Sequence, residues 1–87
     1  MKRPLPPSVV EDALVRLRRI EGQARGVQQM LSEGRSCTDI ITQLSAMRSA
    51  INKVAVALIT ENLQGCLQGD GTPEEIAEAK RTLLRFS

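Results

Sequence analysis

The sequence predicts an all-α protein with three helices per chain, in which an antiparallel helical hairpin dimerises into a four-helix bundle. Three segments each begin with a residue pattern that caps a helix, and apolar residues recur at helical spacing along all three. Only one of the 87 residues is aromatic, which suits a core of Leu, Ile, Val and Ala between closely packed helices. A chain of this length is expected to form one domain, residues 1–87, and such domains often depend on oligomerisation, disulfides or metal for stability.

The first helix is expected over residues 8–33. Ser8 and Glu11 have the spacing of a capping box, and Gly34 follows the last apolar position, where a helix commonly ends. Residues 1–7 contain three prolines and two basic residues and are expected to form a flexible tail. The apolar positions of this helix lie on one stripe: Val10, Leu14, Leu17, Ala24, Val27 and Leu31.

The second helix, over residues 36–67, determines the expected architecture. Ser36 caps its start, and Asp39 lies in its first turn. At about 48 Å it is longer than a small globule needs, and a partner of the first helix's length cannot cover its apolar stripe. Two hairpins that pair into a four-helix bundle would bury the whole stripe. The stripe contains Ile40, Ile41, Leu44, Met47, Ile51, Ala55, Leu58, Ile59 and Leu63.

The third helix is expected over residues 73–85. Thr72 and Glu75 form a second capping box, with Pro73 at the first helical position. The residues expected to face inward are Ile76, Ala79, Leu83 and Leu84.

Composition restricts the compartment and the class of partner. No apolar run is long enough to span a membrane, and the first residues lack the apolar region of a secretory signal, so a cytoplasmic protein with reduced thiols is expected. The net charge is +2, but residues 1–35 carry seven Lys and Arg against four Asp and Glu. This local basic excess favours a polyanionic partner.

The chain has two cysteines, Cys37 and Cys66, and no histidine. One continuous helix holds them about 44 Å apart and rotates one by only about 20° from the other, so both lie on the apolar stripe at opposite ends. They cannot meet within one chain. In an antiparallel dimer, Cys37 of one chain can lie near Cys66 of the other, which gives two equivalent sites.

Several kinds of chemistry are open to these thiols. Both can be small buried hydrophobes, but Cys37 falls in the first turn of a helix, where the helix end stabilises an anion and favours a reactive thiolate. The absence of a C-x-x-C motif disfavours a dithiol enzyme, and two thiolates without histidine fall short of a zinc site. Two-coordinate Cu(I) remains possible. Asn62 lies one turn before Cys66 on the same face.

The basic side chains lie on both sides of the first helix. Arg16 and Arg19 flank one side of its apolar stripe, and Arg18 and Arg25 flank the other. Their spacing from acidic residues predicts the ion pairs Asp12–Arg16, Glu21–Arg25 and Arg18–Glu21, which are typical of a solvated surface. On the second helix, Lys53 is expected on the outer face and Arg48 beside the apolar stripe. In a symmetric oligomer these cations form a broad surface that can bind phosphates.

Four stretches of the chain resemble the CsoR/RcnR family of bacterial transcriptional repressors. They are RLRRIEGQARG at 16–26, Cys37, QLSAMRSA at 43–50, and NLQGC at 62–66, and the similarity covers residues 12–67. The resemblance implies a four-helix-bundle dimer, a disc-shaped tetramer made of two dimers, and repression of a stress or efflux operon. It also implies an inducer site between subunits, at the cysteines, that weakens DNA binding. Neither an enzyme nor a resident cofactor is expected.

The residues around Cys66 indicate the branch of the family. Copper sensors have a histidine four residues before the second cysteine, where this chain has Asn62, and nickel and cobalt sensors need more histidines. Formaldehyde sensors lack the second cysteine. The chain is most similar to the CstR-like persulfide sensors, which keep both cysteines and lack the histidine.

This similarity implies a repressor that senses persulfide or polysulfide through Cys37 and Cys66, whose di- or polysulfide crosslink releases operator DNA. The alternative is a Cu(I)-responsive repressor of copper efflux that uses the two thiolates. A sulfurtransferase and a helical oligomer with inert cysteines are further possibilities. By the resemblance, Arg16 and Lys53 match DNA-contact positions, and Arg18, Arg19 and Arg48 are additional candidates.

Overall fold

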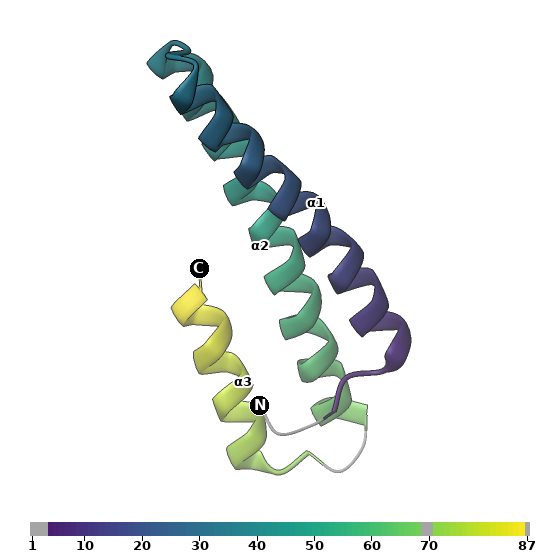
Figure 1. The fold of residues 1–87 in the computed structure, drawn as a ribbon. Coiled ribbons are helices and arrows are strands. Elements are labelled where there is room, and N and C mark those ends of the chain that lie inside the picture. The colour runs from purple at the N-terminus through teal and green to yellow at the C-terminus, as the bar shows by residue number, and fades with distance from the viewer. Residues whose placement is uncertain (1–3, 69–70, 87) are drawn as a thin grey trace.

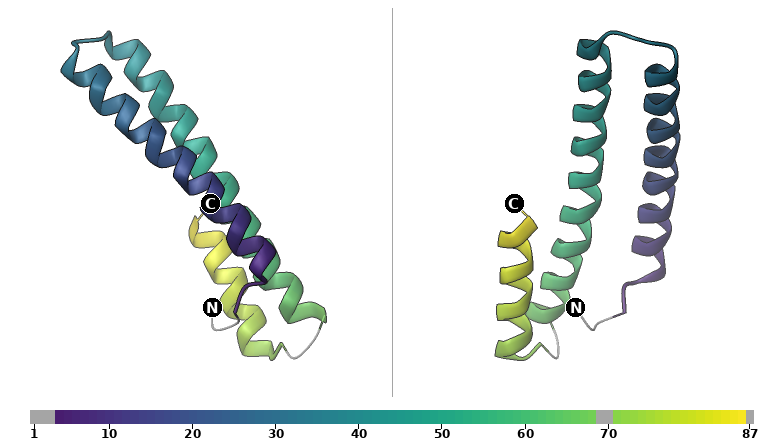
Figure 2. Two further views of the ribbon diagram at one scale, coloured as in Figure 1. Left: turned by 45° about the vertical axis from the view of Figure 1, so that its right-hand side comes forward. Right: turned by 60° about the vertical axis from the view of Figure 1, so that its left-hand side comes forward.

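The computed structural model contains three helices: α1 (Pro7–Ser32), α2 (Cys37–Gln68) and α3 (Pro73–Phe86). It describes residues 4–68 and 71–86, and the side chains of 65–68 lie outside the described part. Helices α1 and α2 form an antiparallel hairpin, and α3 folds back along the C-terminal half of α2 (Figure 1). Helix α2 lies between the other two, which do not contact each other within the described residues (Figure 2). The predicted all-α chain of three helices is confirmed.

The start of α1 differs from the prediction. The helix begins at Pro7 with Pro6 as its N-cap, and the Pro6 carbonyl accepts from the Val9 and Val10 N–H groups at 3.0 and 3.1 Å. Ser8 therefore lies inside the first turn and caps nothing, so the predicted Ser8–Glu11 capping box is wrong. The physical reason is Pro7, because its fixed φ and missing N–H suit the first helical position.

The other helix ends follow the sequence signals. Ser36 Oγ accepts from the Asp39 N–H at 3.2 Å, and Thr72 Oγ1 accepts from the Glu75 N–H at 3.1 Å. Helix α1 ends in a Schellman motif, in which Gly34 adopts a φ of 69°. Its N–H donates to the Leu31 carbonyl, and the next N–H, that of Arg35, donates to the Met30 carbonyl. This tight reversal places Cys37 at the first position of α2.

A single chain buries little apolar surface. Its radius of gyration is 16.6 Å, against about 12 Å for a compact domain of this length. Among the described residues only four apolar side chains are buried: Val27, Val54, Ile59 and Ala79. Leu83 and Leu84, which were predicted to face inward, are 37% and 75% exposed, because they lie about 40° and 140° round α3 from the buried Ala79. No helix within the described residues is long and apolar enough to cross a membrane.

Candidate functional site

Cys37 is the first residue of α2 and is exposed at the tip of the hairpin. The Arg35 guanidinium and the Asp39 carboxylate, one on each side of it in sequence, form an ion pair at 3.5 Å. Helix α2 runs without a break from Cys37 to Gln68, so Cys66 lies about 44 Å along the same helix. The side chain of Cys66 lies outside the described part of the chain. The two thiols of one chain therefore cannot form a common site.

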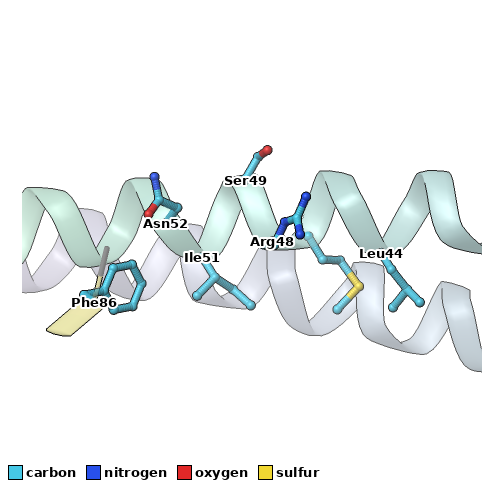
Figure 3. A pocket seen from close by; sticks show the side chains of 7 residues that line it. Leu44, Arg48, Ser49, Ile51, Asn52 and Phe86 are labelled. Atoms are coloured by element: carbon cyan, nitrogen blue, oxygen red, sulfur yellow. The ribbon is translucent and has the colours of Figure 1, made fainter. Parts of the chain in front are cut away.

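The side of α2 between the two cysteines is apolar and partly uncovered. In its first half, Ile41, Leu44 and Ile51 are 54%, 43% and 44% exposed. Leu44, Ile51 and Phe86 lie along one side of α2, around a hollow of about 530 Å³ that Arg48 also lines (Figure 3). A second hollow, of about 310 Å³, lies between the second half of α2 and α3, and Ala55 is one of the α2 residues that line it. We call the uncovered residues Ile41, Leu44, Arg48 and Ile51 the α2 seam.

Asn62 is the one buried polar side chain among the described residues, with 7% exposure. It stands three and four residues after Ile59 and Leu58, which line the hollow between α2 and α3, and one turn before Cys66. A carboxamide oxygen is a hard donor and a poor ligand for a soft metal ion. The described residues contain no group of three or more His, Cys, Asp or Glu side chains that could hold a metal.

The structure brings together three of the five basic candidates for DNA contact. Arg16 and Arg19 from α1 and Lys53 from α2 line one hollow of about 340 Å³ between the two helices. Arg18 does not line this hollow, and Arg48 belongs to the α2 seam instead.

The predicted ion pairs of α1 form in two of three cases. Arg16 Nε lies 2.8 Å from Asp12 Oδ2, and Arg25 lies 3.8 Å from Glu21. The predicted Arg18–Glu21 pair is wrong, since no ion pair joins these two described residues. The preference of an acidic residue for a basic one four residues later explains why Glu21 turns to Arg25.

The family of metal-sensitive transcriptional repressors matches residues 10–85. The chain belongs to this family. It is 41% identical over 77 residues to the copper-sensing transcriptional repressor RicR of Mycobacterium tuberculosis, covering 82% of this chain and 80% of RicR. It is 43% identical over 77 residues to the copper-sensing repressor CsoR of Bacillus subtilis, covering 83% of this chain and 75% of CsoR. The structure of CsoR with Cu(I) from Geobacillus thermodenitrificans superposes with a TM-score of 0.82 at 30% identity, covering 97% of this chain and 92% of that one.

These matches settle the class of protein. The chain is a transcriptional repressor, not an enzyme, as the sequence predicted, and operator DNA is the partner that a repressor requires. The resemblance to the CsoR/RcnR family is confirmed, while the finer assignment to its persulfide-sensing branch stays a prediction, because both of these relatives are named as copper sensors.

Proposed function

We propose that this repressor releases its operator when an inducer reacts at two equivalent sites between subunits, each built from Cys37 of one chain and Cys66 of its partner. The uninterrupted helix α2 supports this arrangement, since it keeps the thiols of one chain apart. The repressor then acts as a dimer of helical hairpins, and two dimers form the disc-shaped tetramer.

The uncovered α2 seam supports an antiparallel pairing of two α2 helices. If Cys37 lies opposite Cys66 of the partner, the same register places Leu44 opposite Ile59 and puts Ile51 beside the two-fold axis. Exposed apolar side chains of the seam are then removed from water, which stabilises the pair. In this pairing, the second half of α2 is covered on one side by the partner's α2 and on another by the α3 of its own chain.

The donor set favours sulfane sulfur as the inducer, meaning the transferable sulfur of a persulfide or polysulfide. The chain has no histidine, and Asn62 occupies the position that copper sensors fill with that residue. Cys37 is exposed and is the first residue of α2, where the end of a helix favours an attacking anion. This combination of an accessible thiol, a second thiol and no imidazole is the observation that carries the proposal.

The reaction has two balanced steps. The Cys37 thiolate attacks the terminal sulfur of a hydropersulfide RS–SH, which forms Cys37–S–SH and expels the thiolate RS⁻. The Cys66 thiolate of the partner then attacks the inner sulfur, forms the interchain disulfide and expels HS⁻, so two thiolates are oxidised and sulfane sulfur is reduced. If both cysteines are first persulfidated, they condense to a trisulfide and release H₂S.

The crosslink acts on DNA binding through the hairpin. Arg16 and Arg19 belong to α1 and Lys53 belongs to α2, so their spacing depends on how the two helices pack. A covalent bond that fixes α2 against its partner favours one packing arrangement. If DNA binds this arrangement more weakly than the other, the crosslink lowers DNA affinity, by at most the ratio of the two affinities.

Cu(I) is the second candidate inducer, and the comparisons alone support it better, because the named relatives are copper sensors. Cys37 and the partner's Cys66 would supply two soft thiolate donors, a set that suits Cu(I). Bound Cu(I) would join the two subunits at the same place without oxidising the thiols.

One experiment separates the two inducers. Reduced protein on an operator duplex, selected in vitro from a random pool, is treated anaerobically with polysulfide or titrated with Cu(I) against a competing chelator. Sulfane sensing predicts a covalent dimer by intact mass and loss of DNA binding, both absent in Cys37→Ala and Cys66→Ala. If Cu(I) binds tightly and releases the duplex while polysulfide leaves the chains uncrosslinked, the first candidate is wrong and the second is supported.

A further inference from the structure

The α2 seam is part of a regular heptad pattern that runs along one side of α2. Its positions are alternately four and three residues apart, and apart from two polar residues they are apolar or small. A heptad pattern pairs two helices but fixes their register weakly, because a slip by one heptad, about 10 Å, brings equivalent positions opposite each other again. The positions are Cys37, Ile41, Leu44, Arg48, Ile51, Ala55, Leu58 and Asn62.

The open half of the seam favours a register that keeps the cysteines apart. The exposed apolar residues of the seam belong to the first half of α2, whereas α3 lies along the second half. If two first halves pair, the two-fold axis passes beside position 48, and Leu44 of each chain meets Ile51 of the other. Cys37 then lies opposite the partner's Ile59, about 10 Å from Cys66. We call this register the slipped pairing, and the register that joins the cysteines the productive pairing.

Arg48 stands at the centre of the slipped pairing. It lies between Leu44 and Ile51 along α2 (Figure 3), is exposed, and forms no ion pair with any described residue. In the slipped pairing, the Arg48 side chains of the two chains meet at the two-fold axis, inside an apolar contact. Two like charges repel each other there, and each also loses bound water. A cation at this position therefore opposes the slipped pairing.

The productive pairing separates the same two cations. With Cys37 opposite the partner's Cys66, Arg48 lies opposite the partner's Ala55, and the two Arg48 positions are about 10 Å apart along the helices. Ala55 is small and lines the hollow of about 310 Å³ between α2 and α3. The long side chain of Arg48 therefore has room to keep its charged end in water. The register that joins the cysteines is also one that tolerates the arginine.

We propose that Arg48 is a positioning residue, which sets the register of the two α2 helices by excluding the slipped pairing. This deepens the proposed function and rests on it, since the selected register brings Cys37 to the partner's Cys66. One polar residue in an apolar heptad seam can select a register at some cost in stability. A slip in the opposite direction centres on Ala55, where α3 already lies against α2, so it needs no such residue.

Introduced thiols report the slipped pairing. In a Cys37→Ala, Cys66→Ala background, Ile41→Cys and Ala55→Cys place two thiols that face each other across the slipped pairing. In the productive pairing they lie about 10 Å apart, beyond the reach of a disulfide. With Arg48 present, oxidation by diamide should give little covalent dimer. Arg48→Leu should raise the initial crosslinking rate at least about tenfold, and Arg48→Lys, which keeps the charge, should not.

Lys80→Leu is the matched control for the loss of a cation. Lys80 is exposed on α3 and lines neither the hollow beside the seam nor the one between α2 and α3. It should leave the crosslinking rate as low as it is with Arg48 present. If Arg48→Leu and Lys80→Leu give the same rate, Arg48 does not select the register and the inference is wrong.

The natural cysteines provide a second test, on the reduced full-length chain. Arg48→Leu should leave the dimer intact or tighter by sedimentation, since an apolar side chain replaces a cation in the seam. Polysulfide should nevertheless join Cys37 to the partner's Cys66 more slowly. Loss of the dimer in Arg48→Leu would show that Arg48 holds the chains together, and would overturn the inference.

The two assays keep this inference distinguishable from the proposed function. If no pair of thiols crosslinks in any variant, the two α2 helices do not pair, and both proposals fail. If the natural cysteines crosslink and Arg48→Leu changes neither assay, the role of Arg48 is refuted while the site between subunits stands.

Discussion

At the scale of single residues, Asn62 separates the two candidate inducers. It is buried, and it lies one turn before Cys66. Replacing it by histidine restores the third donor of the copper sensors that the chain resembles. Asn62→His is therefore expected to raise Cu(I) affinity at least tenfold, measured by competition with a chelator, and to reduce crosslinking by polysulfide. Ala57→His, on the exposed side of α2 opposite to both cysteines, adds an imidazole far from either thiol and should change neither quantity. If Asn62→His leaves Cu(I) affinity unchanged, Asn62 does not lie at the inducer site.

Residue patterns predicted the cations of the basic hollow but not the glutamine between them. Arg16, Arg19 and Lys53 were found from their charge and from the resemblance, whereas nothing in the sequence marked Gln23, which lines the same hollow. The missing information is which face of α1 meets which face of α2. Matching spacings at 16, 19, 20 and 23 and at 46, 49, 50 and 53 were a signal, but each helix has other faces with the same spacing.

At the scale of helices, the cap of α2 connects stability with thiol reactivity. Ser36 Oγ accepts from the Asp39 N–H at 3.2 Å and so holds the first turn, which begins at Cys37. Ser36→Ala is expected to lower the free energy of unfolding by about 1 kcal/mol in urea. In a Cys66→Ala background it should also slow alkylation of Cys37, because a frayed turn stabilises a thiolate less.

Ser45→Ala is the matched control for this prediction, since Ser45 is exposed in the interior of α2. It should change neither the stability nor the alkylation rate appreciably. If Ser36→Ala destabilises the protein but Cys37 reacts at its normal rate, the helix end does not activate the thiol.

Helix ends show how far local sequence signals extend. The ends marked by Ser36, Thr72 and Gly34 follow from short-range rules, because a side-chain cap or a left-handed glycine acts within a few residues. The start of α1 could not be predicted in this way. The Ser8–Glu11 pattern competes there with Pro7, which lies one residue earlier and takes the first helical position. The inward predictions for Leu83 and Leu84 are wrong for a different reason: a short helix that packs through one narrow face leaves neighbouring apolar residues outside.

At the scale of the whole molecule, the hairpin is an incomplete structure on its own. It extends over 52 × 25 × 14 Å and exposes twelve large apolar side chains among the described residues. The length of α2 and its end-to-end stripe were enough to predict this from the sequence. The sequence did not reveal that α3 lies along the second half of α2 and reaches the α2 seam only with Phe86, which leaves the seam largely open.

The open α2 seam provides the last prediction, because Ile51 lies beside the proposed two-fold axis. Ile51→Glu places one carboxylate from each chain in the apolar contact. The dimer then loses the buried Ile51 side chains and must remove two carboxylates from water. Two lost side chains are worth about 3 kcal/mol per dimer, so the dissociation constant of the dimer should rise at least roughly a hundredfold, measured by sedimentation. Polysulfide should then no longer crosslink the chains, since Cys37 and the partner's Cys66 are not held together.

Val56→Glu is the matched control for Ile51→Glu. Val56 is 41% exposed, close to the 44% of Ile51, but it lies well round α2 from the seam. It should leave both the dimer and the crosslink intact. If the two variants sediment alike, the general exposure of apolar side chains would explain assembly as well as the seam does. If Ile51→Glu still crosslinks as efficiently as the unmodified chain, the two cysteines meet by a pairing that does not pass through the middle of α2.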